Sequence, residues 1–339
     1  MGAKVIFAGV GYHLPERVVT SAEVQARVYE TTRFTIPRGL VQKVTGIETR
    51  HYASDNEQAS DLAYKASQIA MEQARMNPND FDLLIFASCM QDVAEPATAN
   101  ILQEKLGASR AHVFDIKNAC NSFLNGLDVA ESLIHAGKAR NALIAAGETL
   151  SYCINWGIDS VTKLRSGLSG LTLGDAGAAA ILKVEPNGNG RGILPPMFKS
   201  YGDQWRLATV LGGGSMYRSA ADHAYFFSAR SQELREQALK YIPQFVKMTL
   251  ERVGWTPDDV DLVCTHQVTM EIVEELAKLT GIAYEKCVVS VKDCGNTAAA
   301  SIPIGLARAQ AEGRLKPYAK VLLVGGAAGF SVGVVPIVW

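Results

Sequence analysis

The stretch PNDFDLL at residues 78–84 returns as PDDVDLV at residues 257–263, an offset of 179 residues. At the same offset, NALIAAG at 141–147 matches KVLLVGG at 320–326, and a third, shorter match lies between these two. Matches in one order at nearly one spacing indicate two halves that are built alike. The sequence therefore predicts a duplicated fold.

Apolar, β-rich runs alternate with helical patterns along the whole chain. The expected strands are residues 5–10, 83–88, 142–147, 178–184, 262–265, 288–291 and 321–325. The spacing of apolar residues at 62–76 and 236–253 predicts helices. This alternation predicts an α/β protein with buried sheets. We expect an N-terminal half at residues 1–190 and a C-terminal half at 191–339, joined near residues 186–196.

Composition excludes several classes of function. The chain has 339 residues, is 48% hydrophobic, and has a formal net charge of -1, which gives no electrostatic basis for binding nucleic acid or an anionic membrane. No apolar run reaches the length of a membrane span. Six cysteines are scattered singly, which favours a reduced, cytoplasmic compartment. Neither they nor the histidines follow a metal-ligand spacing, so we expect no metal site and no cofactor.

Cys120 lies between an apolar run at residues 111–116 and a helical pattern. The apolar stripe of that helix consists of Phe123, Leu127, Ala130 and Ile134. A helix N-terminus favours a thiolate, because it offers unpaired N–H groups and the positive end of the helix dipole. We therefore expect Cys120 to have a lowered pKa and to act as a nucleophile. The alternative is a small buried hydrophobe, as free cysteines usually are.

Two polar residues of the second half also follow apolar runs. His266 comes almost directly after the strand expected at 262–265, and Asn296 follows the one expected at 288–291. Taken singly, each is more often structural, but the carboxyl ends of strands in α/β sheets are the usual place for chemistry. On the repeat alignment Cys120 corresponds to Asn296 or its neighbour. A thiolate, an imidazole and an amide donor are what acyl transfer through a thioester requires.

Further motifs surround these residues in a fixed order. They are GVGYHLPE at 9–16, VTGI at 44–47, AC at 119–120, GDAGA at 174–178, HQ at 266–267 and GNTAAASIP at 295–303. Over essentially the whole chain, the sequence resembles the β-ketoacyl-acyl-carrier-protein synthase III branch of the thiolase superfamily. The resemblance implies a duplicated five-layered α/β/α/β/α sandwich and a homodimer. It also implies an acyltransferase that forms a β-keto product by Claisen condensation of acyl thioesters carried by coenzyme A or acyl carrier protein.

The resemblance also implies roles for individual residues. Cys120 would be the acylated nucleophile, and His266 and Asn296 would hydrogen-bond the enolate oxygen formed in condensation. Backbone N–H groups of Cys120 and Ala328 would form the oxyanion hole for the acyl-cysteine.

Glu95, in VAEPAT at 93–98, departs from the fatty-acid enzymes. Those enzymes carry at the aligned position an apolar residue that enters the partner subunit's acyl pocket. A glutamate there is similar to the branch that condenses two acyl thioesters head to head, in olefin and pyrone formation. Such a reaction has no malonyl carboxylate to expel, so a base must remove an α-proton. We expect Glu95 of the partner subunit to be that base. The alternative is a residue that merely precedes Pro96 at a helix start.

Two other departures concern the thioester carrier. Glu271, followed by Glu274 and Glu275, replaces a basic residue that helps dock acyl carrier protein in the family. Leu40 replaces a tryptophan that often stacks on the adenine of coenzyme A. Alternatives to non-decarboxylative condensation are decarboxylative condensation with a malonyl extender and acyl transfer to an alcohol or amine in specialised metabolism. A different class is a non-catalytic acyl-binding subunit of a biosynthetic complex.

Overall fold

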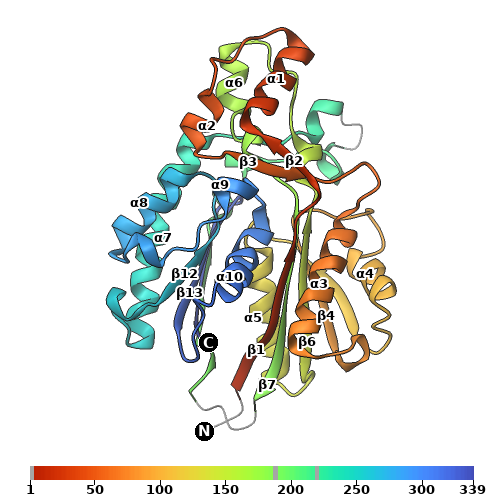
Figure 1. The fold of residues 1–339 in the computed structure, drawn as a ribbon, viewed down its shortest axis with the longest axis vertical. Coiled ribbons are helices and arrows are strands. Elements are labelled where there is room, and N and C mark those ends of the chain that lie inside the picture. The colour runs from red at the N-terminus through yellow and green to blue at the C-terminus, as the bar shows by residue number, and fades with distance from the viewer. Residues whose placement is uncertain (1–3, 186–189, 218–220) are drawn as a thin grey trace.

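The computed structural model describes residues 4–185, 190–217 and 221–339, so the first four residues of the junction expected at 186–196 lie outside it. Two five-stranded sheets organise the described chain (Figure 1). The last strand of the first sheet ends at Glu185, and the first strand of the second sheet begins at Gly192. We propose on this basis that the halves divide at residues 190 and 191.

The first sheet has the strand order β1-β7-β6-β4-β5. Its strands are β1 (Lys4–His13), β4 (Leu83–Ala87), β5 (His112–Ile116), β6 (Asn141–Glu148) and β7 (Ala176–Glu185). β4, β5 and β6 run parallel, whereas β7 pairs antiparallel with both β6 and β1. The carboxyl ends of the three parallel strands therefore meet at one edge of the sheet.

The second sheet has the strand order β12-β13-β14-β8, and β9 also pairs with β14. Its strands are β8 (Gly192–Ile193), β9 (Met197–Ser200), β12 (Leu262–Thr265), β13 (Lys320–Ala327) and β14 (Ser331–Val338). β12 and β13 are parallel and β14 is antiparallel to β13, as β4, β6 and β7 are in the first sheet. The internal repeat correctly predicts this duplicated topology.

Helices alternate with the sheets in five layers (Figure 1). The outer pair on the first sheet is α3 (Ala59–Ala74) and α4 (Thr98–Leu106), the central pair is α5 (Ser122–His135) and α10 (Ser301–Ala311), and the outer pair on the second sheet is α7 (Ser231–Val253) and α8 (Met270–Thr280). The central helices share one buried core with both sheets. The expected α/β/α/β/α sandwich is confirmed.

A cover of short elements lies over one end of both sheets, at the top of Figure 1. It includes β2 (Arg17–Thr20), α1 (Ser21–Thr32), α2 (Leu40–Thr45), β3 (Thr49–Tyr52) and α6 (Val161–Gly167), with α9 (Val291–Cys294) below them and the pair β10 (Ala208–Thr209) and β11 (Ser228–Ala229) beside α6. Apolar residues of the cover, such as Val24, Val28 and Val41, form a buried cluster together with Leu150, Leu173 and Ala298. This cluster closes the space above the carboxyl ends of the parallel strands.

One predicted strand is wrong. Residues 288–291 form no ladder in the described chain. The preceding Cys287 makes an isolated bridge with Val263, the N–H of Val288 donates to the carbonyl of Val263 at 2.9 Å, and α9 begins at Val291. The side chain of Gln267 forms hydrogen bonds with the backbone of this segment, as a neighbouring strand would. Its oxygen accepts two backbone N–H groups of the segment, at 2.9 and 3.1 Å, and its nitrogen donates to a backbone carbonyl of the segment at 2.6 Å.

α3 packs closely on the first sheet because glycines face it. A Cβ at Gly147 would lie 1.8 Å from the carbonyl oxygen of Ala59, and one at Gly177 would lie 1.9 Å from that of Leu62. Gly147 and Gly177 are cross-strand neighbours on β6 and β7. Only glycine allows such a close approach of two backbones. The contact fixes the end of β6, where Glu148 follows.

We predict that Gly147→Ala lowers the free energy of unfolding by about 1–3 kcal/mol, as overpacking of a core does, because the new methyl group meets backbone atoms of α3. Urea unfolding followed by circular dichroism measures the change. Gly202→Ala is the matched control, since nothing lies within 4 Å of a Cβ there. Equal destabilisation of the two variants would contradict the proposed contact.

Candidate active site

Three polar residues lie at the carboxyl ends of the parallel strands in the first sheet. Cys89 follows β4, Cys120 follows β5, and Glu148 is the last residue of β6. His266 occupies the matching place in the second sheet, directly after β12. Because both sheets present these ends toward the cover, residues far apart in sequence meet in one region.

A tight turn presents Cys120 just before α5. Ala119 has a positive φ of 48°, a conformation that non-glycine residues rarely adopt. Ser122 stabilises the turn, because its hydroxyl donates to the carbonyl of Ala119 at 2.7 Å and accepts the N–H of Asn118 at 2.8 Å. Cys120 thus precedes the N-cap residue of α5, Asn121. The sequence predicts this position correctly.

The surroundings of Cys120 favour the ionised form of its thiol. The neighbouring Cys89 thiol, and then the charge of His266 and its hydrogen bond, hold the pKa of Cys120 well below its ordinary value, although burial acts in the opposite direction. The pKa of Cys89 is raised well above its ordinary value by Cys120 and by burial. The direction for Cys120 agrees with the sequence-based prediction, and the side chains of Cys89 and His266 supply causes that the prediction did not include.

His266 is held in one orientation toward Cys120. Its backbone N–H donates to the carbonyl of Val324 at 2.8 Å. The Ser301 hydroxyl donates to the carbonyl of Ala298 at 2.7 Å, so its oxygen accepts from Nδ1 of His266 at 2.9 Å. Nε2 is therefore the ring nitrogen available to Cys120. Burial alone would lower the pKa of His266, but the charge of Cys120 and its hydrogen bond raise it above the ordinary value.

Asn296 is fixed by backbone hydrogen bonds to the first half. Its N–H donates to the carbonyl of Thr172 at 2.8 Å, and its carbonyl accepts the N–H of Gly174 at 3.0 Å. Its side-chain oxygen accepts the N–H of Ala298 at 3.1 Å. The amide nitrogen is left to donate into the cavity that Asn296 lines.

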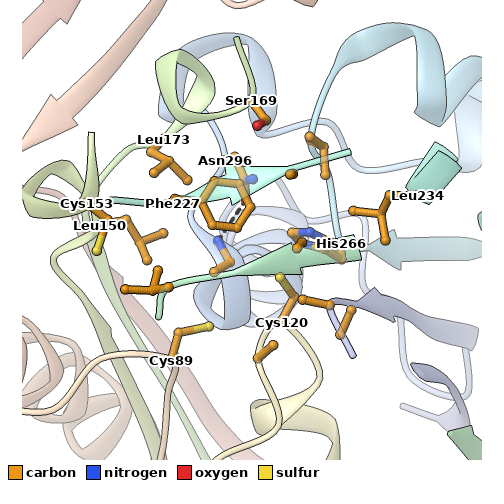
Figure 2. A pocket seen from close by; sticks show the side chains of 18 of the residues that line it. Cys89, Cys120, Leu150, Cys153, Ser169, Leu173, Phe227, Leu234, His266 and Asn296 are labelled. Atoms are coloured by element: carbon orange, nitrogen blue, oxygen red, sulfur yellow. Dashed lines mark hydrogen bonds between the residues drawn. The ribbon is translucent and has the colours of Figure 1, made fainter. Parts of the chain in front are cut away.

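Cys120, His266 and Asn296 line one cavity of about 1060 Å³ (Figure 2). The wall around them is mainly apolar and includes Leu150, Cys153, Leu173, Phe227 and Leu234. Both halves of the chain contribute to this wall. The volume is slightly above the usual range for small-molecule sites, about 300–1,000 Å³. A cavity of this size and lining can hold an extended apolar group attached to a reacting carbonyl.

Of the two remaining predicted site residues, Ala328 lines the cavity and Glu95 does not. Ala328, in the turn between β13 and β14, lines the same cavity as Cys120. Glu95 is exposed, in the segment between β4 and α4, and is not among the described residues that line the cavity of its own chain. A single chain therefore brings together Cys120, His266, Asn296 and Ala328, but not Glu95.

The rim of the cavity carries both signs of charge. Arg235 on α7 forms ion pairs with Glu271, at 3.4 Å, and with Glu275, both on α8. Arg235 comes from a different helix than the glutamates and partly neutralises the acidic face that they form. Leu40 at the start of α2 is not among the described lining residues, whereas Val44 of the same helix is.

Sequence reasoning missed Cys89, Glu148 and Ser301. The rule that singles out Cys120, a polar residue after a parallel strand, applies equally to Cys89 and Glu148 and could have found both. Ser301 lies within the recognised motif at 295–303, but its contact with His266 depends on the turn at Ala298, which has a positive φ of 42°. No sequence signal predicts that turn.

Two general findings concern the described ranges 4–185, 190–217 and 221–339. Within them, no group of three or more histidine, cysteine, aspartate or glutamate residues is placed to hold a metal ion. Nor does any helix there combine the length and apolar character that a membrane crossing requires.

We predict that His266→Ala slows alkylation of Cys120 by iodoacetamide at pH 6 by at least about tenfold, because the thiol loses the charge and the hydrogen bond that lower its pKa and is ionised to a much smaller fraction at that pH. The two rates should converge at high pH, where both thiols are ionised. Intact-mass measurements with peptide mapping give the rates, and Cys120→Ser identifies the labelled peptide. Identical pH profiles for wild type and variant would rule out the thiolate–imidazolium pair.

Known protein families and relatives match this chain along its length. A family model described as 3-oxoacyl-[acyl-carrier-protein (ACP)] synthase III matches residues 114–202, and its C-terminal counterpart matches residues 250–339. The chain is 32% identical over 342 residues to the β-ketoacyl-[acyl-carrier-protein] synthase III of Dinoroseobacter shibae, with 100% of both chains covered.

Two solved structures extend the comparison. The 3-oxoacyl-[acyl-carrier-protein] synthase III of Aquifex aeolicus has a TM-score of 0.85 at 29% identity, covering 100% of both chains. A variant of Xanthomonas campestris OleA with bound lauric acid and lauroyl-CoA has a TM-score of 0.88 at 25% identity, covering 99% of both chains. Together with the sequence matches, these likenesses show that the chain belongs to the 3-oxoacyl-[acyl-carrier-protein] synthase III family of acyl-condensing transferases.

Proposed function

We propose that this enzyme condenses two acyl thioesters without decarboxylation, with Glu95 of the partner subunit as the base. In the first step, the Cys120 thiolate attacks a thioester carbonyl, and the carrier leaves as a thiolate that takes a proton from water, so that His266 keeps its Nε2 proton. In the second, Glu95 removes an α-proton from another acyl thioester, and the resulting enolate attacks the acyl-cysteine. A β-keto thioester forms and the Cys120 thiolate is released.

The other site residues stabilise the two oxyanions of this sequence. Ionised Cys120 is stabilised by His266 before acylation, and backbone N–H groups of Cys120 and Ala328 would receive the oxyanion of the acyl-cysteine. His266 Nε2 and the amide nitrogen of Asn296 would then hold the enolate oxygen of the second substrate. Donors fixed in advance, in a cavity with apolar walls, stabilise such charges more than water does.

The observation that carries the proposal is the position of Glu95 on an exposed loop whose ends are anchored by hydrogen bonds. Asp92 and Thr98 hold the two ends of its loop together, because the N–H of Asp92 donates to the hydroxyl of Thr98 at 3.1 Å. Asp115, on β5, accepts the N–H groups of Thr98 and Ala99, both at 2.8 Å. Glu95 is therefore presented to solvent from an anchored loop beside β5.

β5 is the edge strand of the first sheet. It pairs with β4 on one side, and no described strand pairs with its other side. Unpaired edges readily accept a strand from another molecule. A homodimer that forms along β5 would bring the Glu95 loop of each chain toward its partner, which supports action of Glu95 across the interface.

The apolar cavity supports a fatty acyl thioester as substrate. The similar OleA variant was solved with lauric acid and lauroyl-CoA bound, and the curated relatives are named for an acyl-carrier-protein-dependent synthase. We propose acyl groups carried by coenzyme A or acyl carrier protein. Arg235 of α7, paired with two glutamates of α8, provides a cation at the rim of the cavity.

Decarboxylative condensation with a malonyl thioester is the second candidate. The curated relatives support it equally, since they are named β-ketoacyl-[acyl-carrier-protein] synthase III. In that reaction the malonyl group forms the carbanion by losing carbon dioxide, so Glu95 would have no chemical task. It would then be an exposed acid shortly before α4, where a negative charge favours the helix N-terminus.

We predict that the wild-type protein forms a β-keto product from lauroyl-CoA alone, and that Glu95→Gln loses at least about 100-fold in this rate, within the usual contribution of a general base. Acylation of Cys120 should persist in the variant. Mass spectrometry of products and of intact protein follows both steps. Glu104→Gln, which changes an exposed acid on α4, is the control. Product only in the presence of malonyl thioester, unaffected by Glu95→Gln, would instead establish the decarboxylative reaction.

A mixture of two inactive variants tests action across the interface. Heterodimers of Glu95→Gln and Cys120→Ser chains would contain one site with intact Cys120 from one chain and intact Glu95 from the other. We predict that co-expressed and co-purified chains recover up to about half of the activity per heterodimer, whereas each variant alone stays inactive. No recovery in a verified heterodimer would show that Glu95 acts within its own chain or not at all.

A further inference from the structure

Glu148 is a buried carboxyl group that the condensation mechanism does not use. Its exposed fraction is 0%. It is the last residue of β6 and directly follows Gly147, against which α3 packs. At the repeat offset of 179 residues its counterpart is Ala327. An acid at this strand end is therefore no requirement of the duplicated fold. It occurs only in the half that carries the nucleophile.

One carboxyl oxygen of Glu148 joins the two halves of the site. Oε1 accepts the N–H of Cys89 at 2.9 Å and the N–H of Ala299 at 3.3 Å. Cys89 belongs to the first half, and its thiol neighbours Cys120. Ala299 belongs to the second half and lies between Asn296 and Ser301 in sequence. A single atom thus links the surroundings of the nucleophile to the segment that carries Asn296 and, through Ser301, orients His266.

The surroundings of the second oxygen of Glu148 favour the uncharged form of the carboxyl group. Oε2 is buried and has no hydrogen-bond partner among the described residues. The titratable groups whose charge couples to this carboxyl are the thiols of Cys89, Cys120 and Cys153 and the imidazole of His266. Burial, followed by the Cys120 charge, raises the pKa of Glu148 to about 8 despite its hydrogen bonds. A carboxylate beside a thiolate would be repelled, whereas a carboxylic acid would not.

We propose that Glu148 is a positioning residue that, as a neutral acid, fixes the spacing of the Cys120 nucleophile in one half and the His266–Asn296 pair in the other. It is not a second base for condensation. It does not line the cavity, and its Oε1 is already engaged by two backbone donors. Its effect passes through Cys89 and Ala299.

This proposal depends on acylation of Cys120 but not on Glu95, so its test reads the acylation step alone. We expect Glu148→Ala to slow transfer of the lauroyl group from lauroyl-CoA to Cys120 by about tenfold to 100-fold, as small misplacements of reacting groups do. Glu148→Gln should restore most of the rate, because an uncharged amide can accept the same two N–H groups. Intact-mass spectrometry of the protein measures the rate, and circular dichroism checks the fold.

The pH dependence of the acylation rate distinguishes a positioning role of Glu148 from an effect on the stability of the fold. In wild type, ionisation of Glu148 near pH 8 should place a second negative charge beside the Cys120 thiolate and slow acylation. Glu148→Gln should lack this decline, whether or not Glu148→Ala folds. Asp175→Asn is the matched control, because Asp175 is also a buried acid held by backbone N–H groups, at Ala53 and Ser151. It should keep the wild-type pH profile even if the variant is less stable.

Three results would overturn the proposal. Loss of acylation in Glu148→Gln as severe as in a folded Glu148→Ala would mean that the site needs the carboxylate charge. Wild-type acylation in a folded Glu148→Ala would mean that the link is dispensable. An unchanged decline near pH 8 in Glu148→Gln would assign that ionisation to another group. Failure of condensation with normal acylation would count against the Glu95 base and leave Glu148 untouched.

Discussion

The contact between the Cys120 thiol and the His266 imidazole is the interaction on which the rest of the site depends. The two residues come from different sheets, so their contact exists only because the two halves pack around shared central helices. Attraction between a thiolate and an imidazolium is weak in water and strong in an apolar setting. The apolar cover above the strand ends is therefore part of the chemistry, since it provides that setting for both charges.

Charge around this pair has to be limited, because every further buried ion changes both pKa values. A neutral Glu148 satisfies this condition and still accepts two backbone N–H groups. Ser301 satisfies it as well, because a hydroxyl orients His266 without adding charge. In many enzymes a carboxylate orients the catalytic histidine and favours its protonated form. Here a hydroxyl does so, and Cys120 itself supplies the negative charge that raises the pKa of His266.

The sequence predicted two halves of one kind because each half must bury the same kind of sheet, and that requirement leaves a repeat at nearly one offset; the five-layered sandwich followed from the resemblance to the family. It also placed Cys120, His266 and Asn296, since each follows an apolar run. It did not predict the contacts that tune them. Gln267 hydrogen-bonds the backbone of residues 288–291, Ser301 reaches His266 through a turn with positive φ, and Arg235 meets α8 from another helix. Each of these contacts joins distant segments through a single side chain. A local sequence pattern therefore cannot predict it.

The proposed role of Glu95 as a base requires that its carboxylate lie in an environment with little water. Such a base works in a setting poor in water, yet in a single chain Glu95 is exposed on an anchored loop beside an unpaired sheet edge. On our proposal, assembly along β5 moves this carboxylate from solvent into the partner's apolar cavity, and burial of that kind raises basicity. Folding would then prepare the acylation site within each chain, while dimerisation would add the group that distinguishes condensation of two acyl thioesters from condensation with malonate.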